Sequence, residues 1–510
     1  MNRAGGSGVL WSGGRSGRSG RSGRSGRSGS GGRSGNSRCR QVASATVSRA
    51  AASAANYGSS RSSRFSRPLL GIAALAVIAT PTSAQEPRTI TLQEAIDLAC
   101  RHNPAYLRAV AQADATGADV RAGIGGFLPS VAADLRFAGG TQTVFTGTDD
   151  FGQPIVRDDP LTSDNSSSSQ SIGANLTLFD GLRNVNTLRA AGAGADAMAY
   201  QLDAEAMRVD REVKQGFYAA LQAEQLVGIE DRLLAARRQE LDATERLFRV
   251  AGQTRVDVLG AQIEVARQEQ ALQTALGDAR KRALDLAEVI GLEMDGDITV
   301  EGAFPEPFDP ASLDVNALVG RAATRHPRVE QASAAAAEAR FRATAAHGAR
   351  LPTITASTGF TRRVSTQDFN SLFELDPPDR SFSFSFGVEI PIFNRFQTSQ
   401  TIAQASVQRT LAEENLRQER LTVEREARSA LIDLENAYRN LQLAQRSAEL
   451  GRLRVQMARE QFQAGTIGFT NFQQIANSSA NEERQELAAR LNWANALAAV
   501  EALVGEEVGP

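Results

Sequence analysis

The run SFSFSFGVEI at residues 381–390 alternates strictly between polar and apolar side chains. Successive side chains of a β-strand point to opposite faces, so this alternation predicts a strand with one apolar and one polar face. The apolar face carries Phe382, Phe384, Phe386 and Val388, and the polar face carries Ser383, Ser385 and Glu389. Soluble sheets seldom present a row of three Phe side chains to water, so this face is expected to meet an apolar surrounding.

Three other segments alternate in the same way, at residues 130–137, 171–179 and 353–361. The segments have about nine to eleven residues, the length of a strand that crosses an outer membrane at a tilt of about 45°. Any one of them also fits a half-buried sheet in a soluble domain. Four strands in two hairpins favour a membrane sheet, and residues 138–170 and 362–380 are then expected to be outward-facing loops.

Four strands cannot close a barrel, and an open sheet edge in lipid leaves backbone groups unpaired at several kcal/mol each. Oligomerisation is therefore expected. Physics does not select the copy number, but three chains would give a barrel with an even number of strands. Within such a barrel Leu176 and Leu178 would join the lipid-facing residues of strand 381–390, and Asn175 and Asp134 would join its lumen-facing residues.

Two very long helices are predicted at residues 183 to about 250 and 396 to about 464, and each returns through a shorter partner helix. At a rise of 1.5 Å per residue, roughly 68 residues form a rod of about 100 Å. Apolar residues recur every seven positions from Val213 to Phe248, a spacing typical of coiled-coil packing.

The sequence repeats itself. Asn103-Pro104 and His326-Pro327 introduce similar helical patterns, and Leu178-Phe179-Asp180 corresponds to Ile392-Phe393-Asn394. Such self-similarity predicts two copies of one structural unit. We place the first repeat at 88–290, a Pro-rich linker at 291–312 and the second repeat at 313–505.

The first 84 residues differ from the rest in composition. Residues 1–66 consist largely of Arg-Ser-Gly triplets, which offer almost no apolar surface and are expected to be absent from the mature protein. Residues 67–84 combine arginine, an apolar run and small residues, as in a secretory signal peptide. Arg/Gly/Ser repeats also occur in RNA-binding segments, and a translation start nearer Val42 or Val47 would remove most of them. Beyond residue 84, 43 basic residues face 58 acidic residues, which disfavours a nucleic-acid partner.

Enzyme chemistry finds little support in the sequence. The three histidines are scattered, and His102 and His326 each lie beside a helix boundary rather than in a metal-ligand cluster. The glycines at 123–126 precede a strand, whereas a dinucleotide-binding loop follows one. We therefore expect no enzyme, no cofactor and no metal site.

Several ordered motifs together resemble one family. They are the opening Leu92-x-x-Ala95-Ile96-x-Leu98-Ala99-x-x-x-Asn103-Pro104, the Leu-Pro entry to a strand, the Leu178-Phe179-Asp180-Gly181 exit from one, and the stretch AGQTRVDVL at 251–259. Over about residues 88–505 the chain resembles the TolC-like outer-membrane efflux proteins. The resemblance implies an α+β membrane protein of a Gram-negative bacterium, a homotrimer whose outer-membrane β-barrel continues into a periplasmic α-helical coiled-coil barrel.

The same resemblance implies a function. Such a trimer would be the exit duct of a tripartite efflux or type I secretion system, with outer-membrane lipid, a periplasmic adaptor and an inner-membrane pump of RND or ABC type as its partners. A periplasmic coiled-coil scaffold without a channel is the alternative, although it leaves the Phe row unexplained.

Closure in this family occurs at the periplasmic tip, which implies a gate at the two helix-hairpin turns. The candidate residues are Arg249, Gly252, Arg255 and Asp257 in the first turn, and Gly465, Asn471 and Gln474 in the second. Both glycines are expected to adopt positive φ, or simply to terminate helices. No charge lies between residues 461 and 481, so closure is expected to depend more on the first turn.

Overall fold

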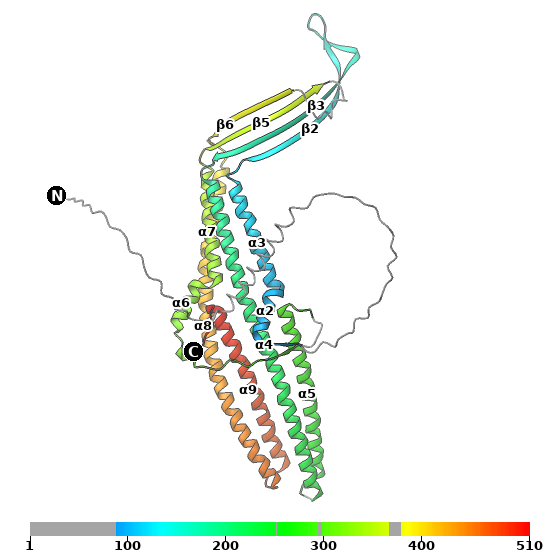
Figure 1. Ribbon diagram of the computed structural model, residues 1–510, viewed down its shortest axis with the longest axis vertical. Coiled ribbons are helices and arrows are strands. Elements are labelled where there is room, and N and C mark those ends of the chain that lie inside the picture. Colours follow the sequence, from blue (N-terminus) through cyan, green and yellow to red (C-terminus); the bar gives the residue numbers. More distant parts are fainter. Residues whose placement is uncertain (1–87, 251, 294–297, 367–378, 510) are drawn as a thin grey trace, which may run out of the picture. The chain divides into compact units, whose positions relative to one another are not determined.

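The computed structural model describes residues 88–509, apart from residues 251, 294–297 and 367–378. The predicted Arg/Ser/Gly head and signal peptide lie outside the described residues. The first half of the described chain runs β1 (Arg88–Ile90), α2 (Leu92–His102), α3 (Pro104–Gly125), β2 (Ser130–Thr148), β3 (Pro154–Phe179), α4 (Arg183–Arg249) and α5 (Arg255–Ile290). The second half runs β4 (Ile298–Val300), the 3-10 helix η2 (Pro310–Ser312), α6 (Val315–Arg325), α7 (Pro327–Gly348), β5 (Thr353–Thr366), β6 (Asp379–Glu389), α8 (Gln397–Gln463) and α9 (Phe469–Val504) (Figure 1). Two helices, two strands and a helical hairpin thus follow one another in the same order twice.

The two helical hairpins match in length. Helices α4 and α8 have 67 residues each, and their partners α5 and α9 have 36 residues each, which confirms the predicted long helices to within a residue or so. The predicted seven-residue spacing lies in the packed seam at Val213 and Leu234, which are buried, whereas Phe248 near the end of α4 is exposed.

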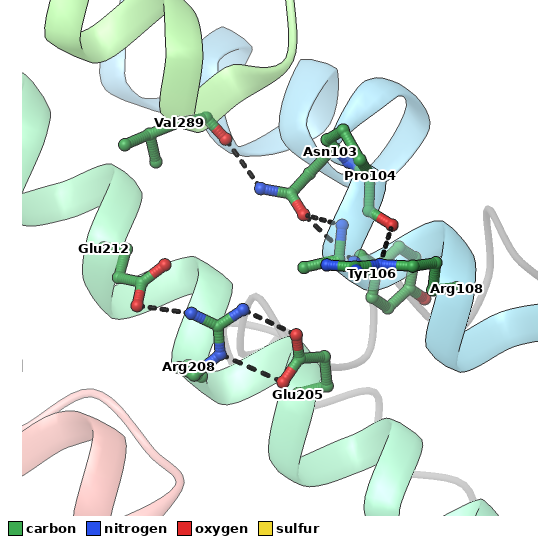
Figure 2. Close-up of polar contacts among 9 residues, drawn as sticks. Asn103, Pro104, Tyr106, Arg108, Glu205, Arg208, Glu212 and Val289 are labelled. Carbon is green, nitrogen blue, oxygen red and sulfur yellow. Dashed lines mark hydrogen bonds and ion pairs between the residues drawn. The ribbon is translucent and has the colours of Figure 1, made fainter.

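Helices α3 and α7 begin in the same way. Asn103 Oδ1 accepts hydrogen bonds from the backbone N–H groups of Ala105 and Tyr106 at 2.9 and 3.0 Å, and Pro104 follows as the first helical residue. Asn103 Nδ2 also donates to the carbonyl of Val289 in the last turn of α5, at 2.7 Å (Figure 2). His326 takes the corresponding place before Pro327, its Nδ1 accepting from the N–H of Arg328 at 3.2 Å. Each cap satisfies donors that a helix start leaves without an intrahelical partner.

The long strands form one antiparallel sheet in the order β2-β3-β5-β6, which Figure 1 shows as four adjacent strands. Strand β6 covers nearly all of the predicted strand 381–390. Strands β2 and β6 are the edges of this sheet in the described part of the chain. The short strands β1 and β4 pair separately and in parallel.

The prediction of a loop at residues 138–170 is wrong, because β2 and β3 continue through most of this segment. Here short polar side chains bind across the two strands: Thr141 Oγ1 donates to Asp164 Oδ1 at 2.7 Å, and the hydroxyls of Thr143 and Thr162 lie 3.2 Å apart. Strands held together by such polar pairs need no alternation of polar and apolar residues. The alternation that predicted the other strands therefore did not predict the pairing within residues 138–170. In the same way β5 runs on to Thr366, into the second predicted loop at 362–380, whose residues 367–378 lie outside the described chain.

The helices bury three apolar clusters. One gathers around Phe217, Leu286 and Ile290, and a second around Trp493, Leu434 and Val423. The third lies at the hairpin turns around Phe462 and Phe472. Among the described helices, none combines the length and apolarity that crossing a bilayer requires.

Candidate functional site: the sheet faces and the hairpin turns

Strand register decides which side chains share a face of the sheet. Phe386 pairs with Ala356, which pairs with Leu176, and Phe382 pairs with Phe360, which pairs with Ile172. Directly paired residues point to the same side. Phe382, Phe384, Phe386, Val388 and Leu176 therefore lie on one face, and Phe384 is 70% exposed within the single chain.

The opposite face is polar. Ser385, Ser357, Asn175 and Ser130 form one row across all four strands, and Ser381, Thr361, Ser171 and Asp134 form another. The hydroxyls of Ser357 and Ser385 lie 2.6 Å apart, so one donates to the other. Ser383 and Glu389 share this face by their register on β6.

The register differs from the predicted alternation at Leu178. Thr177 pairs with Thr355, but the next pair joins Phe179 to Ile354, so Leu178 is the extra residue of a β-bulge. The bulge places Phe179 opposite Ile354, which in turn pairs with Val388, so Phe179 lies on the apolar face. Strict alternation along the strand would have placed Phe179 on the polar face. Nothing in the alternation of residues 171–179 marks the bulge, and the sequence prediction therefore missed Phe179.

At the first hairpin turn, Gly252 does not adopt the positive φ that we predicted. Its N–H donates to the Leu247 carbonyl at 2.8 Å. Asp257 forms a capping box with Thr254: its Oδ2 accepts from the Thr254 N–H at 2.8 Å, and its own N–H donates to Thr254 Oγ1 at 3.3 Å. Asp257 therefore stabilises the start of α5, which is a role that the sequence analysis did not assign to it.

The two arginines of this turn make no such contact. Arg249 ends α4 and Arg255 begins α5. Both are exposed, and neither forms an ion pair with another described residue of the chain.

At the second turn, Gly465 has the expected positive φ of 72°. Asn471 and Gln474 are exposed on the first turns of α9. Beside them lies an aromatic cluster that the sequence analysis missed: the rings of Phe462 and Phe472 stack with centroids 5.0 Å apart.

The same cluster touches the other hairpin. A Cβ added at Gly260 of α5 would lie 3.1 Å from the ring of Phe469. Small residues on α5 thus allow the aromatic side chains of α9 to pack closely, and the two hairpins are in contact near their turns.

Buried polar groups also join the two hairpins farther from the turns. Arg484 of α9 donates from Nε and Nη2 to the two carboxylate oxygens of Glu230 on α4, at 2.6 and 2.8 Å, and Gln268 of α5 donates to Glu230 at 2.6 Å. Burial alone would raise the pKa of Glu230, but these hydrogen bonds outweigh it and lower that pKa. Lys214 likewise binds Glu501 of α9 at 2.8 Å and Asp210 at 3.1 Å. Partners about 250 to 290 residues apart leave no local pattern, so the sequence alone did not reveal them.

The helices also carry a charged cluster on one surface. Arg208 of α4 binds Glu205 through Nε at 3.0 Å and through Nη2 at 2.6 Å, and it binds Glu212 through Nη1 at 2.5 Å, as Figure 2 shows. No group of three or more His, Cys, Asp or Glu side chains suited to a metal ion occurs among the residues that the structure describes.

Comparison with known proteins agrees with this arrangement. The profile of the family described as "Outer membrane efflux protein" matches residues 95–292 and 318–506. Protein CyaE of Bordetella pertussis is 29% identical over 336 residues, which are 64% of this chain and 66% of CyaE, slightly under two thirds of that relative.

Solved structures share the fold. The structure of CusC superposes with a TM-score of 0.68 at 16% identity, covering 87% of this chain and 99% of CusC. The open state of the Neisseria gonorrhoeae MtrE outer membrane channel gives a TM-score of 0.64 at 18% identity, covering 87% of this chain and 98% of MtrE. With its profile matched over both halves of the chain, the protein belongs to the outer membrane efflux protein family and is a protein of the outer membrane.

Proposed function

We propose that this protein is the outer-membrane exit duct of a tripartite efflux or type I secretion system. In this proposal the chain is built from two structural repeats, three chains close a 12-stranded β-barrel, and the helical hairpins extend the barrel through the periplasm as a tunnel. The duct is not an enzyme. It receives its cargo from an inner-membrane pump of RND or ABC type through a periplasmic adaptor protein.

The observation that carries the proposal is the sheet formed by β2, β3, β5 and β6. One face carries the exposed side chains of Phe382, Phe384 and Phe386, and the other carries Ser383, Ser385 and Asn175. Lipid suits the first face and water the second. The edge strands β2 and β6 have no further strand partner among the described residues, and lipid would not tolerate open edges. Closure with other copies satisfies both edges and encloses the polar face as the lumen.

The turns at Arg249–Asp257 and Gly465–Gln474 form the gate in this proposal. Arg249 and Arg255 have no ion-pair partner in the described chain and are therefore available to neighbouring subunits or to the adaptor. The apolar contact of Gly260 with Phe469 holds the two hairpins together from within the chain. An opening motion that separated the two hairpins of one chain would break this contact.

Two measurements test the proposal. Fractionation should place the protein in detergent-extracted outer membranes, and the purified protein should give discrete conductance steps in planar lipid bilayers. A periplasmic coiled-coil scaffold would appear in the soluble periplasmic fraction and give no conductance, and that result would refute the duct. Copurification with an adaptor and a pump after cross-linking in cells tests the partners separately.

A further inference from the structure

The apolar face of the sheet ends in two arginines. Arg362 of β5 pairs directly with Arg380 of β6, and the pair formed by Phe360 and Phe382 lies two residues away on each strand. Residues two apart on a strand point to the same side, so both arginines share the face of the Phe row. Arg380 is exposed. At this end of the sheet the face that we assign to lipid therefore changes from aromatic to cationic.

The polar face differs at the same level. Arg363 lies on the polar face, and its partner across the strand pair is Asp379. Opposite charges directly across a strand pair stabilise it, whereas like charges destabilise it. The same two strands thus place a favourable pair on the polar face and an unfavourable pair, Arg362 with Arg380, on the outward face. An anion bound from outside would remove the repulsion of the outward pair.

Arg380 has no carboxylate beside it in the described sheet. It forms no ion pair with any residue that the structure describes. The row continues from Arg362 to Gln170 of β3 and Leu135 of β2, and both of these residues are uncharged. On the outward face of β3 the nearest carboxylate is Asp164, six residues from Gln170 and therefore about 20 Å away along the strand.

The length of β6 places the arginine pair at a boundary of the membrane. The strand has 11 residues, of which Arg380 is the second, and its last residue, Glu389, lies at the end that continues into α8. At about 3.4 Å per residue and a tilt of about 40°, the nine steps between them span about 23 Å of membrane. The apolar band of an outer-membrane barrel is about 25 Å tall. With Glu389 at the periplasmic boundary, Arg380 lies at the outer boundary.

The neighbouring aromatic pair supports this placement. Aromatic side chains flank the apolar band of such barrels at both interfaces. Phe360 and Phe382 are exposed and lie one row closer to the middle of the membrane than the arginines. An arginine side chain has a long apolar stem, which can lie along apolar surface while the guanidinium group reaches the headgroup region.

We propose that Arg362 and Arg380 bind phosphate groups of lipopolysaccharide, the phosphorylated glycolipid of the outer leaflet. A guanidinium group binds phosphate through two parallel hydrogen bonds, and paired Cα atoms of antiparallel strands are about 4.5–5.5 Å apart. Both side chains can therefore contact one phosphate group or two neighbouring ones. The proposal rests on the proposed function, because a membrane-inserted barrel turns this face toward lipid. It adds a binding site and the chemistry of its ligand.

Binding at this site has a consequence for stability. Bound phosphate neutralises the like-charge pair and holds the outer ends of β5 and β6 together. Lipopolysaccharide should therefore raise the unfolding temperature of the wild-type protein, because a ligand that binds only the folded state stabilises that state. The double variant Arg362→Ser with Arg380→Ser should show no such rise. A rise of equal size in the double variant would show that the lipid acts at another place.

A binding titration tests the site directly. Full-length protein is purified in detergent, freed of lipid and titrated with fluorescent lipopolysaccharide. The double variant Arg362→Ser with Arg380→Ser should bind about tenfold more weakly than the wild-type protein, because it loses both charge-assisted contacts. Arg363→Ser is the matched control, because it removes a neighbouring arginine from the polar face. Its affinity should stay within about twofold of the wild-type value, since exposed charge pairs such as Arg363 with Asp379 contribute little.

The wild-type protein alone tests the chemistry of the ligand, so this result does not depend on the folding of a variant. Lipopolysaccharide stripped of its lipid A phosphates should bind the wild-type protein as weakly as the intact lipid binds the double variant. Phosphatidylglycerol is the second probe. It should bind about tenfold more weakly than intact lipopolysaccharide, because its single phosphate diester carries less charge for the two guanidinium groups.

Each outcome decides a separate point. Equal affinity of the wild-type protein and the double variant would overturn the site, and so would equal affinity for intact and dephosphorylated lipopolysaccharide. Phosphatidylglycerol that bound as tightly as lipopolysaccharide would overturn the assignment to the glycolipid. A wild-type protein that conducts in planar bilayers without binding lipopolysaccharide would overturn this inference alone. A protein that forms no channel would refute the proposed function as well.

Discussion

Arg484 and Glu230 form a two-pronged ion pair between α9 and α4, with N–O distances of 2.6 and 2.8 Å. The Glu230 carboxylate is almost fully buried, whereas Arg484 is 36% exposed. Removing the arginine would leave a buried carboxylate with Gln268 as its remaining partner.

We therefore expect Arg484→Met to lower the free energy of unfolding by about 2 kcal/mol, below the usual range for a fully buried pair because solvent reaches Arg484. Arg238 and Glu269 provide the matched control, an exposed pair at 2.8 Å between α4 and α5. Arg238→Met should change stability by less than about 1 kcal/mol. Thermal unfolding in detergent measures both, and equal effects would show that the buried pair contributes no more than the exposed one.

The first hairpin turn allows the capping role of Asp257 to be separated from its charge. Thr254→Ala and Asp257→Ala both break the capping box, at about 1 kcal/mol each, but only the second removes a charge. If charge holds the gate, Asp257→Ala and Arg255→Ala raise single-channel conductance in planar bilayers, whereas Thr254→Ala and Asn471→Ala leave it near the wild-type value. A rise in Thr254→Ala equal to that in Asp257→Ala would assign the effect to the cap.

The two faces of β6 should tolerate different substitutions. Phe384→Leu keeps an apolar side chain toward lipid, whereas Phe384→Arg places a charge there at about 2–4 kcal/mol near the membrane midplane. Ser383→Asp adds its charge to the polar face and should alter only conductance. Heat-modifiable oligomers in outer-membrane extracts report assembly. Loss of assembly in Ser383→Asp as severe as in Phe384→Arg would reverse the assignment of the faces.

His326 makes stability depend on pH. Burial, followed by the charge of Arg328, lowers the pKa of His326 to about 4, although Glu426 and a hydrogen bond to the backbone of Ala502 oppose this. Arg211 of α4 adds a further repulsion. The unfolded chain, with a pKa near 6.5, binds this proton more readily than the folded chain. Stability from this residue is therefore complete above about pH 6.5 and is lost as pH falls toward 4, by at most about 3 kcal/mol.

The corresponding position in the first half supplies the control substitution. Asn103 caps α3 without titrating, so His326→Asn should keep the cap of α7 and remove this part of the pH dependence. Melting temperatures at pH 7.5 and 5 compare the two proteins. An unchanged pH dependence in His326→Asn would show that other groups cause it.

Signal cleavage is a separate prediction. The small residues Thr82 and Ala84 follow the apolar run, which predicts cleavage after Ala84. N-terminal sequencing of protein extracted from outer membranes should begin at Gln85 or within a few residues. A mature protein that still carries the Arg-Ser-Gly triplets would contradict the assignment.

Sequence periodicity predicted the parts of this fold that repeat a simple period. Alternation identified β6 and the segments 130–137, 171–179 and 353–361 of β2, β3 and β5, and the apolar spacing identified α4, because burial of one face imposes those periods. Periodicity failed where an element is not held in place by the burial of one apolar face. The outer ends of β2 and β3 rest on pairs such as Thr141 with Asp164, and Phe179 owes its place to a bulge.

The sequence also predicted the structure of the two candidate gate turns only in part. Glycines mark both turns, yet only Gly465 adopts positive φ. The role of Asp257 in a capping box was readable in principle from Thr254 three residues earlier. The contacts of Gly260 with Phe469 and of Glu230 with Arg484 join distant parts of the chain, so no local sequence pattern predicts them.

The equal lengths of α4 and α8, and of α5 and α9, restrict how such a gene can change. A seven-residue deletion preserves the apolar spacing of one helix, but it shortens that helix by about 10 Å. The turn of the shortened hairpin then no longer lies beside the turn of the other hairpin. The contact of Gly260 with Phe469 would then be lost. We therefore expect a length change in one hairpin to be retained only together with a matching change in the other, which would couple segments that lie more than 200 residues apart in the sequence.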